Sequence, residues 1–222
     1  MNGKHEICNM QILVIAASKE EILPFSTNTA GIDILITGVG VPATMYHIQK
    51  RIQQIGYDII IQAGIAGSFT KNLALGYTGL VKQDCFADIG VVEKETFTPI
   101  FETGLSDKNE FPFENGWLIN KHKNLLNNHL TSLSAITVNK VSDSDLQKEQ
   151  FIKTYNADIE TMEGAALHYI CLQEDIPFLQ IRSVSNYVAE RDKSKWEIKS
   201  AIKNLNKELV TLINNLSDKI IV

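Results

Sequence analysis

Apolar runs of strand length, separated by segments of helical period, constrain the fold of this chain more than any other feature. Residues 10–17 (MQILVIAA), 58–62 (DIIIQ) and 177–184 are mostly apolar stretches rich in β-branched residues, as in strands buried on both faces of a parallel sheet. Residues 42–55 and 163–174 instead repeat apolar side chains at helical spacing. This alternation predicts an α/β fold, a three-layer sandwich in which helices cover both faces of a mixed, mostly parallel central sheet.

The rest of the chain extends the same pattern. Further strands are expected at residues 31–37, 80–86 and 134–138, and further helices at residues 145–155 and 194–216. Residues 93–117 fit neither period and carry five aromatic side chains, so we expect a long loop that forms a lid or a binding wall. The chain has 222 residues and no repeat or linker, so residues 1–222 are expected to form a single domain.

Charge and composition exclude several classes of function. The net charge is −5 without a dense Lys/Arg cluster, so no nucleic-acid partner is expected. The apolar runs are far shorter than the roughly 20 residues of a membrane span. The N-terminal residues lack the apolar core of a signal peptide, so we expect a cytoplasmic protein with no membrane partner. Cys8, Cys85 and Cys171 lack metal-ligand spacing and are expected to be reduced thiols, and neither a metal nor an organic cofactor is expected.

Four polar segments lie where a parallel sheet binds its ligands. Residues 18–21 (SKEE), 64–68 (GIAGS) and 185–192 follow predicted strands, and residues 160–164 (ETMEG) open a helix. Because ligands bind outside the carboxyl ends of such strands, we expect these four segments to line one crevice. Glu21, taken alone, is equally compatible with a solvated acid in a first helical turn.

Two charged side chains fall at positions that should point inward. Glu163 shares a helical face with Ala166 and Ile170, and an inward carboxylate requires hydrogen bonds or a partner. It either accepts hydrogen bonds from sugar hydroxyls or caps its own helical turn. Arg182 lies within an apolar strand, so it needs an anion, either in a structural ion pair or in a ligand. Asn186 lies on the same side of that strand, as a ligand contact or as a turn residue.

A glycine-rich turn offers a nucleotide-binding alternative. Residues 38–43 (GVGVPA) match the loose dinucleotide fingerprint, but the next strand ends in Gln62 instead of an acid that could hold a ribose. A tight strand-to-helix turn is the better interpretation. His47 and His168 lie on predicted helices with no second ligand nearby, which indicates packing instead of metal binding.

Five short motifs resemble those of the nucleoside phosphorylase/nucleosidase superfamily, in the same order along the chain. They are residues 15–21 (IAASKEE), 37–40 (TGVG), 63–67 (AGIAG), 162–166 (MEGAA) and 182–186 (RSVSN). The resemblance runs from Ile12 to Leu216 and is strongest to the branch of methylthioadenosine/adenosylhomocysteine nucleosidases and futalosine hydrolases. QAGIAGSF and SNYVAERDKSKW are most similar to futalosine hydrolases. The fold implied is nucleoside phosphorylase-like.

The resemblance implies a role for each matching residue. Glu21 would activate the attacking water and Asn186 would face N7 of the purine, and these are the expected catalytic residues. The residues expected to bind or support the substrate are Met162, Glu163, Arg182, Ser185, Gly64 and Ile65. Methylthioadenosine nucleosidases carry Asp where this chain has Asn186. Because an amide both donates and accepts hydrogen bonds, Asn186 favours a 6-oxopurine such as hypoxanthine over adenine.

The expected function is hydrolysis of the N-glycosidic bond of a purine nucleoside. The resemblance implies futalosine as the substrate, hypoxanthine and dehypoxanthine futalosine as products, and a place in menaquinone biosynthesis. It also implies a homo-oligomer, with a dimer favoured, whose subunits complete each other's pockets. The alternatives are a methylthioadenosine/adenosylhomocysteine nucleosidase, a purine nucleoside phosphorylase and a non-catalytic nucleoside-binding protein. Phosphorylases bind phosphate through Arg in loops that lack Arg here, although Lys19 leaves phosphorolysis open.

Overall fold

A computed structural model describes residues 10–26, 31–94 and 96–218 of the chain. Cys8 lies outside the described residues. The strands of the main sheet follow the order β10 (Phe178–Tyr187), β4 (Thr78–Asp84), β8 (Ser132–Thr137), β9 (Ile159–Thr161), β3 (Ile59–Ser68), β1 (Ile12–Ala16) and β2 (Ile32–Ile36), and β7 (Leu118–Ile119) pairs with β4. Among the described residues, five pairings of this sheet are parallel and three are antiparallel. The predicted α/β fold with a mixed, mostly parallel sheet is therefore confirmed.

Part of the sheet closes on itself, which the sequence did not indicate. β3 pairs with β9 at its carboxyl end and also with β10 along most of its length, so β10, β4, β8, β9 and β3 form a ring. One buried cluster takes its side chains from all five of these strands: Ala66, Val81, Leu133, Ala135, Ile159 and Val184. These small and branched residues fill the interior of the ring, while β1 and β2 extend the sheet beyond it.

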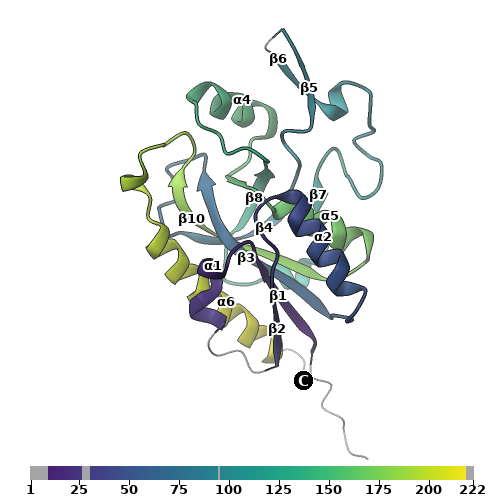
Figure 1. Cartoon of the computed structure of the whole chain (residues 1–222), viewed down its shortest axis with the longest axis vertical. Helices are drawn as coiled ribbons and strands as arrows, with labels where there is room; N and C mark the ends of the chain where they lie inside the picture. Colours follow the sequence, from purple (N-terminus) through teal and green to yellow (C-terminus); the bar gives the residue numbers. More distant parts are fainter. Residues whose placement is uncertain (1–9, 27–30, 95, 219–222) are drawn as a thin grey trace, which may run out of the picture.

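Helices cover both faces of this sheet, as predicted. α1 (Lys19–Ser26) and α6 (Ile198–Asp218) pack on one face, and α2 (Val41–Ile52) and α5 (Gly164–Gln173) pack on the other (Figure 1). α6 buries Ala201, Leu205 and Leu209 completely, at the four-residue spacing that places side chains on one helical face. The three layers bring the carboxyl ends of β1, β3 and β10 together beside the first turns of α1 and α5.

β3 and β10 are longer than the sequence predicts. We expected β3 to end near Gln62 because residues 64–68 are small and glycine-rich, but these residues continue the strand and pair with β10. The glycine at position 64 is required by close packing, since a Cβ atom there would lie 2.2 Å from Nη1 of Arg182. β10 likewise continues through Asn186, with a shift in register between Val184 and Asn186.

Residues 93–117 contain more regular structure than predicted. β5 (Gly90–Glu93) and β6 (Thr96–Pro99) form a hairpin, which the short helix η1 (Ile100–Glu102) follows. The rings of Phe101 and Phe113 pack 5.1 Å apart, and Phe113 lies 6.0 Å from the ring of Tyr169 on α5. Phe113 therefore anchors this segment to α5, and Trp117 packs against Tyr155, with ring centroids 6.3 Å apart.

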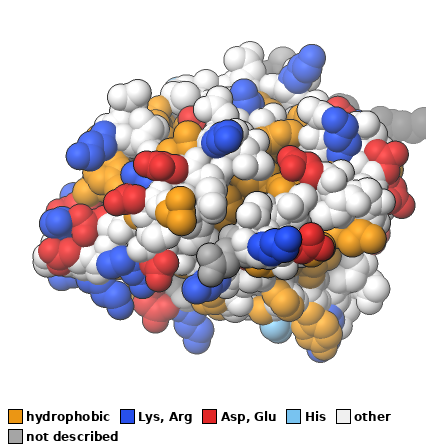
Figure 2. Space-filling view, turned by 90° about the horizontal axis from the view of Figure 1, so that it is seen from above, with side chains coloured by type: hydrophobic (Ala, Val, Ile, Leu, Met, Phe, Trp, Pro, Cys, Tyr) orange, Lys and Arg blue, Asp and Glu red, His pale blue; other side chains and the backbone are white. Residues whose placement is uncertain are grey.

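The remaining helices are α4 (Asp145–Tyr155), which has the predicted bounds, and the short α3 (Lys123–Leu126) and η2 (Lys193–Lys195). Ser144 caps α4 by accepting a hydrogen bond of 3.3 Å from the N–H of Gln147. No helix in the described part of the chain is long and apolar enough to cross a membrane. On the face shown in Figure 2, basic and acidic side chains are interspersed among hydrophobic ones and form no continuous basic area.

Candidate active site

A cavity of about 330 Å³ opens at the carboxyl ends of β1, β3 and β10. All four polar segments singled out in the sequence contribute to its wall. The lining residues are Ala17, Ser18, Glu20, Glu21, Val39, Ile65, Ala66, Gly67, Val141, Glu160, Thr161, Met162, Glu163, Ser185, Asn186, Trp196, Ile198 and Ile202. The structure thus brings Glu21, Glu163 and Asn186 to one cavity, although 165 positions separate the first from the last in the sequence.

Glu21 is buried, although its position in the sequence was equally compatible with a solvated acid in the first turn of a helix. It is only 8% exposed, and its carboxylate accepts hydrogen bonds from the N–H groups of Ser18 at 3.0 Å and Ile65 at 3.1 Å. Burial raises the pKa of the Glu21 carboxyl, and the positive charge of Arg182 and these backbone N–H groups counteract the rise. Glu21 is therefore held in place by the backbone with its pKa displaced toward that of a general base.

Glu163 precedes the first residue of α5 but does not cap that helix with its side chain. One carboxylate oxygen accepts a hydrogen bond of 3.0 Å from the N–H of Gly40, and the other lies 3.8 Å from Nη1 of Arg182. Gly40 has a φ of 90°, a conformation that favours glycine, and it belongs to the turn that precedes α2. The turn at residues 38–43 thus forms the tight strand-to-helix connection that we predicted, and it also donates a hydrogen bond into the site.

Arg182 lies behind the cavity and does not line it. Its side chain is 2% exposed, and Nη2 donates a hydrogen bond of 2.8 Å to Oε1 of Gln62. Gly64 also stays behind the wall, where its missing side chain leaves room for the guanidinium and for Glu21, whose Oε1 would lie 3.0 Å from an added Cβ. The sequence allowed Arg182 to pair either with an acidic side chain or with a ligand, and in the structure it forms an ion pair with Glu163. Arg182, in the space that Gly64 leaves, is therefore positioned behind the cavity wall to stabilise the carboxylates of Glu21 and Glu163.

Asn186 reaches the cavity from the end of β10. Its Oδ1 accepts a hydrogen bond of 2.8 Å from the hydroxyl of Ser185, and its Nδ2 donates one of 3.1 Å to the carbonyl of Tyr187. Ser185 is buried and also lies 3.2 Å from the carbonyl of Ala66. The amide is oriented by its own strand, and it keeps one donor and one acceptor position for a ligand.

Several lining residues were not identified from the sequence. Val39, Val141 and Trp196 form apolar wall, and Ile198 and Ile202 reach in from α6. Val39, Val141 and Trp196 lie outside regular elements, where no hydrophobic period marks them, and the helical pattern of residues 194–216 does not show that Ile198 and Ile202 face a cavity. The described residues between positions 93 and 117 do not line this cavity, but several of them line a separate cavity of about 300 Å³ beside Tyr155.

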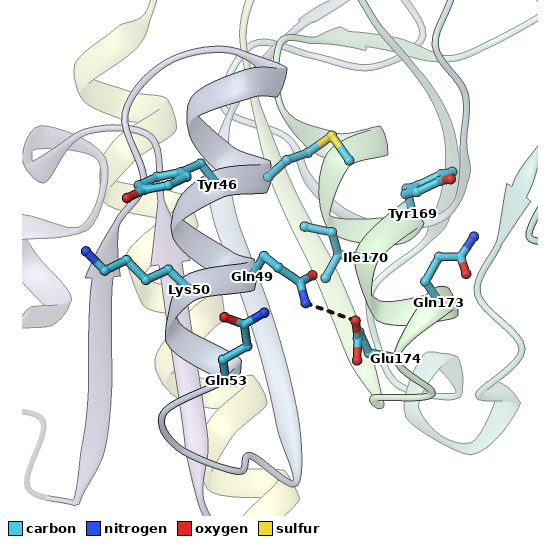
Figure 3. A pocket seen from close by; sticks show the side chains of 9 residues that line it. Tyr46, Gln49, Lys50, Gln53, Tyr169, Ile170, Gln173 and Glu174 are labelled. Atoms are coloured by element: carbon cyan, nitrogen blue, oxygen red, sulfur yellow. Dashed lines mark hydrogen bonds between the residues drawn. The ribbon is translucent and has the colours of Figure 1, made fainter.

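A larger but shallower depression of about 780 Å³ lies between α2 and α5. Figure 3 shows Gln49 of α2 and Gln53, which follows α2, pointing toward Ile170 and Glu174, whereas Tyr46 and Lys50 extend from the other side of α2. Tyr169 and Gln173 complete the lining on the side of α5. Gln49 donates a hydrogen bond of 3.0 Å to Glu174, and no buried charge faces the opening among the described residues. We refer to this surface as the α2–α5 groove. Its side chains provide no convergent acid, base or nucleophile.

The histidines and cysteines take structural positions. His47 is exposed on α2, and His168 is buried with Nδ1 2.9 Å from the carbonyl of Leu118. Cys85 and Cys171 are buried and free. Within the described residues, no group of three or more His, Cys, Asp or Glu side chains is placed to hold a metal ion.

Known proteins resemble this chain over most of its length. A family model described as the phosphorylase superfamily matches residues 12–217. A futalosine hydrolase from Thermus thermophilus is 28% identical over 82% of this chain and 81% of its own length. A 5'-methylthioadenosine/S-adenosylhomocysteine nucleosidase from Arabidopsis thaliana is 25% identical over 89% of this chain and 73% of its own. The solved structure of a Helicobacter pylori futalosine hydrolase has the same fold, with a TM-score of 0.77, 16% identity and coverage of 93% of this chain and 98% of that one.

Proposed function

The chain belongs to the phosphorylase superfamily, and from this we propose that it is a hydrolase that cleaves the N-glycosidic bond of a purine nucleoside, with futalosine as its substrate. The observation that carries the proposal is the cavity itself, in which two buried carboxylates, Glu21 and Glu163, and the amide of Asn186 face one space. A volume of about 330 Å³ is at the low end for small-molecule sites. It suits a nucleoside whose larger 5′ substituent extends beyond the mouth.

In the proposed mechanism, the bond between C1′ and N9 breaks as positive charge develops on the sugar. Glu21 takes a proton from the water that attacks C1′, for which its raised pKa is suited. Glu163 accepts hydrogen bonds from the ribose hydroxyls beside Met162, while Arg182 and Gly40 hold its carboxylate. The sugar keeps the hydroxyl of the water at C1′, and the other proton of the water, taken up by Glu21, is released to solvent as the purine takes one up, so that the nucleoside and water give a free sugar and a neutral purine.

Asn186 would stabilise the departing base, oriented by Ser185. Its amide can donate to a 6-oxo group while its carbonyl accepts from N7–H, a pattern that a 6-oxopurine satisfies and adenine does not. The methylthioadenosine nucleosidase relative keeps an adenine-type substrate open as the second candidate. A site that leaves buried polar groups unpaired with the wrong base can discriminate strongly between the two.

Water is favoured over phosphate as the nucleophile. None of the described residues that line the cavity is Lys or Arg, and Lys19 is exposed outside it. A phosphate dianion would meet Glu21 and Glu163 without a cationic partner on the wall, which is electrostatically unfavourable. The same residues tolerate a neutral water molecule.

We further propose that the protein is a cytoplasmic homodimer that acts in menaquinone biosynthesis, with residues 1–222 as a single catalytic domain. The free, buried thiols of Cys85 and Cys171 are compatible with a reducing compartment. The α2–α5 groove carries the exposed ring of Tyr46, and α2 begins just after Val39, which lines the cavity. A second copy on this face would therefore lie beside the mouth of the cavity.

The function is tested by incubating the protein with futalosine, inosine and methylthioadenosine, with and without inorganic phosphate, and by measuring the released base and sugar. We expect hypoxanthine release from futalosine that does not depend on phosphate, with a free reducing sugar as the other product. Release of ribose 1-phosphate would make the protein a phosphorylase, and preferential release of adenine would make it a methylthioadenosine-type nucleosidase. Tight nucleoside binding without base release would make it a binding protein.

A further inference from the structure

The cavity contains a third buried carboxylate to which the mechanism assigns no role. Glu160 lies in β9, lines the cavity and is 4% exposed. Its hydrogen-bond partners are the N–H of Ser142, at 3.1 Å, and the hydroxyl of the same residue. Among the described residues, no Lys, Arg or His forms an ion pair with it. A buried carboxylate without a cation is costly unless a ligand completes its hydrogen bonds.

The pairing of the strands places Glu160 opposite Asn186. In the sheet, Gly67 pairs with Glu160 on one side and with Asn186 on the other. Directly paired residues project their side chains on the same face, and two strand spacings separate the outer residues by about 9–10 Å. Gly67, Glu160 and Asn186 all line the cavity, and the missing side chain of Gly67 leaves room for the side chains of Asn186 and Val188, since a Cβ there would meet Nδ2 of Asn186 at 3.4 Å and Cγ2 of Val188 at 3.2 Å. The row forms a slot with a carboxylate at one end and an amide at the other.

The carboxylate has acceptor positions left for a ligand. Each of its oxygens can accept two hydrogen bonds, and Ser142 occupies one position on each. Burial raises the pKa of the Glu160 carboxyl, and the hydrogen bonds from Ser142 lower it. A donor in the slot would therefore be bound by a desolvated group, where hydrogen bonds to an ionised partner are strongest.

We propose that Glu160 determines the base specificity of this site by accepting a hydrogen bond from N1–H of a 6-oxopurine whose N7 and O6 face Asn186. A 6-oxopurine carries a hydrogen on N1, whereas a 6-aminopurine presents a lone pair there, which a carboxylate repels. The two side chains at the ends of the slot thus recognise one continuous edge of the same base. This inference rests on the proposed function, because it assumes that the slot holds the purine.

Glu160 also anchors the loop that contains Ser142, so a purely structural role has to be distinguished from recognition. Loss of the anchor would weaken the binding of every base by a similar factor, whereas loss of recognition would change the ratio of hypoxanthine affinity to adenine affinity. Ser142→Ala serves as the matched control because it loosens the loop and retains the carboxylate. The N1-methylated base serves as a probe that needs no variant, because it lacks only the hydrogen in question.

The test measures the binding of hypoxanthine, 1-methylhypoxanthine and adenine by calorimetry, together with hypoxanthine release from futalosine. We expect the wild type to bind hypoxanthine roughly 10- to 100-fold more tightly than 1-methylhypoxanthine. Glu160→Gln should reduce the ratio of hypoxanthine to adenine affinity by a similar factor, while Ser142→Ala should leave that ratio within about threefold. Equal wild-type binding of hypoxanthine and its N1-methyl derivative, or equal losses for both bases in Glu160→Gln, would overturn the inference while base release from futalosine continued. Absence of both base binding and base release would overturn the proposed function as well.

Discussion

The α2–α5 groove is larger than the cavity at the strand ends, but the cavity contains the buried carboxylates that the groove lacks among the described residues. The groove, at about 780 Å³, is the larger, but its charged side chains are on the surface, where Glu174 accepts a hydrogen bond from Gln49. The cavity, at about 330 Å³, holds Glu21, Glu163 and Glu160 at 8%, 6% and 4% exposure. Our assignment of the active site therefore rests on buried charge and not on volume.

The physical reason is that a buried carboxylate lowers stability unless the fold or a ligand compensates it. In the cavity the fold compensates in part, through backbone N–H groups at Glu21 and through Gly40 and Arg182 at Glu163. The groove requires no such compensation because solvent reaches its polar groups. The two regions share α5, which begins beside Glu163 and carries Tyr169 and Ile170 into the groove. Substitutions on either side of this helix can therefore test the contrast.

The largest expected effect is on turnover when the base is removed from the cavity. Glu21→Gln keeps the size of the side chain and one acceptor oxygen but cannot take a proton. We expect kcat for hypoxanthine release to fall by roughly 10²- to 10⁴-fold. Glu149→Gln, on the exposed surface of α4, is the control and should retain wild-type turnover. Near-normal turnover by Glu21→Gln would remove this residue from its proposed role.

The next effect concerns stability against pH and involves the inner side of α5. Burial lowers the pKa of His168 to about 4 from its usual 6.5. Between pH 4 and pH 6.5 the folded protein therefore binds fewer protons at His168 than the unfolded chain does. The contribution of neutral His168 to the free energy of unfolding is fully present above pH 6.5 and decreases as the pH falls toward 4. The loss from this group amounts to about 3 kcal/mol.

Denaturant unfolding from pH 7.5 to pH 4 measures that loss. In His168→Gln the free energy of unfolding should fall less between pH 7.5 and pH 4 than in the wild type, and the difference should be most of the loss assigned to His168. His47→Gln is the matched control, because His47 is exposed on α2 and should leave the profile unchanged. A profile for His168→Gln that runs parallel to the wild type would contradict the assignment.

A smaller effect is expected at the wall behind the cavity. In Gly64→Ala the added Cβ would lie 2.2 Å from Nη1 of Arg182, the atom that faces Glu163, so the guanidinium must shift and its ion pair with Glu163 is disturbed. We expect a loss of about 1–3 kcal/mol in unfolding free energy and a higher KM for the nucleoside. Gly56→Ala is the control, since a Cβ there meets no atom within 4 Å. Unchanged KM and stability in Gly64→Ala would show that Arg182 does not need this space.

The smallest effect on catalysis is expected in the groove. Tyr46→Glu places a charge on an exposed apolar ring position, so it should shift the proposed dimer toward monomer in light scattering. Turnover per chain should fall by less than in Glu21→Gln, because Tyr46→Glu removes a second copy from beside the mouth of the cavity but changes no residue that lines it. Lys153→Glu on α4 is the control for added negative charge. A loss of turnover as large as that of Glu21→Gln would erase the contrast between the two regions.

The sequence predicted the elements better than it predicted the site. Long apolar runs identified β1 and most of β10, and the periodic segment at residues 145–155 gave the bounds of α4. The end of β3 was placed incorrectly because Gly64 and Gly67 are typical of turns, whereas here they make room for other side chains. Local composition cannot distinguish these two uses of glycine.

The site residues found by sequence were those whose type conflicts with their surroundings, such as Arg182 in an apolar strand. Its need for an anion was predicted, but its partner Glu163 is set by tertiary packing that no spacing encodes. Glu160 was placed in the crevice but at the start of a helix and without a role, because β9 has three residues, too few for a period, and the relation of Glu160 to Asn186 depends on pairing through Gly67. Relations across strands become visible only in the folded sheet.

The central claim, that the small cavity with its buried charges is the active site, is tested most directly by a crystal structure of Glu21→Gln with intact futalosine. We predict that C1′ faces the side chain at position 21, that the ribose hydroxyls contact Glu163 and that the base lies in the slot beside Asn186. A nucleoside bound in the α2–α5 groove, or one bound elsewhere without these three contacts, would contradict the account.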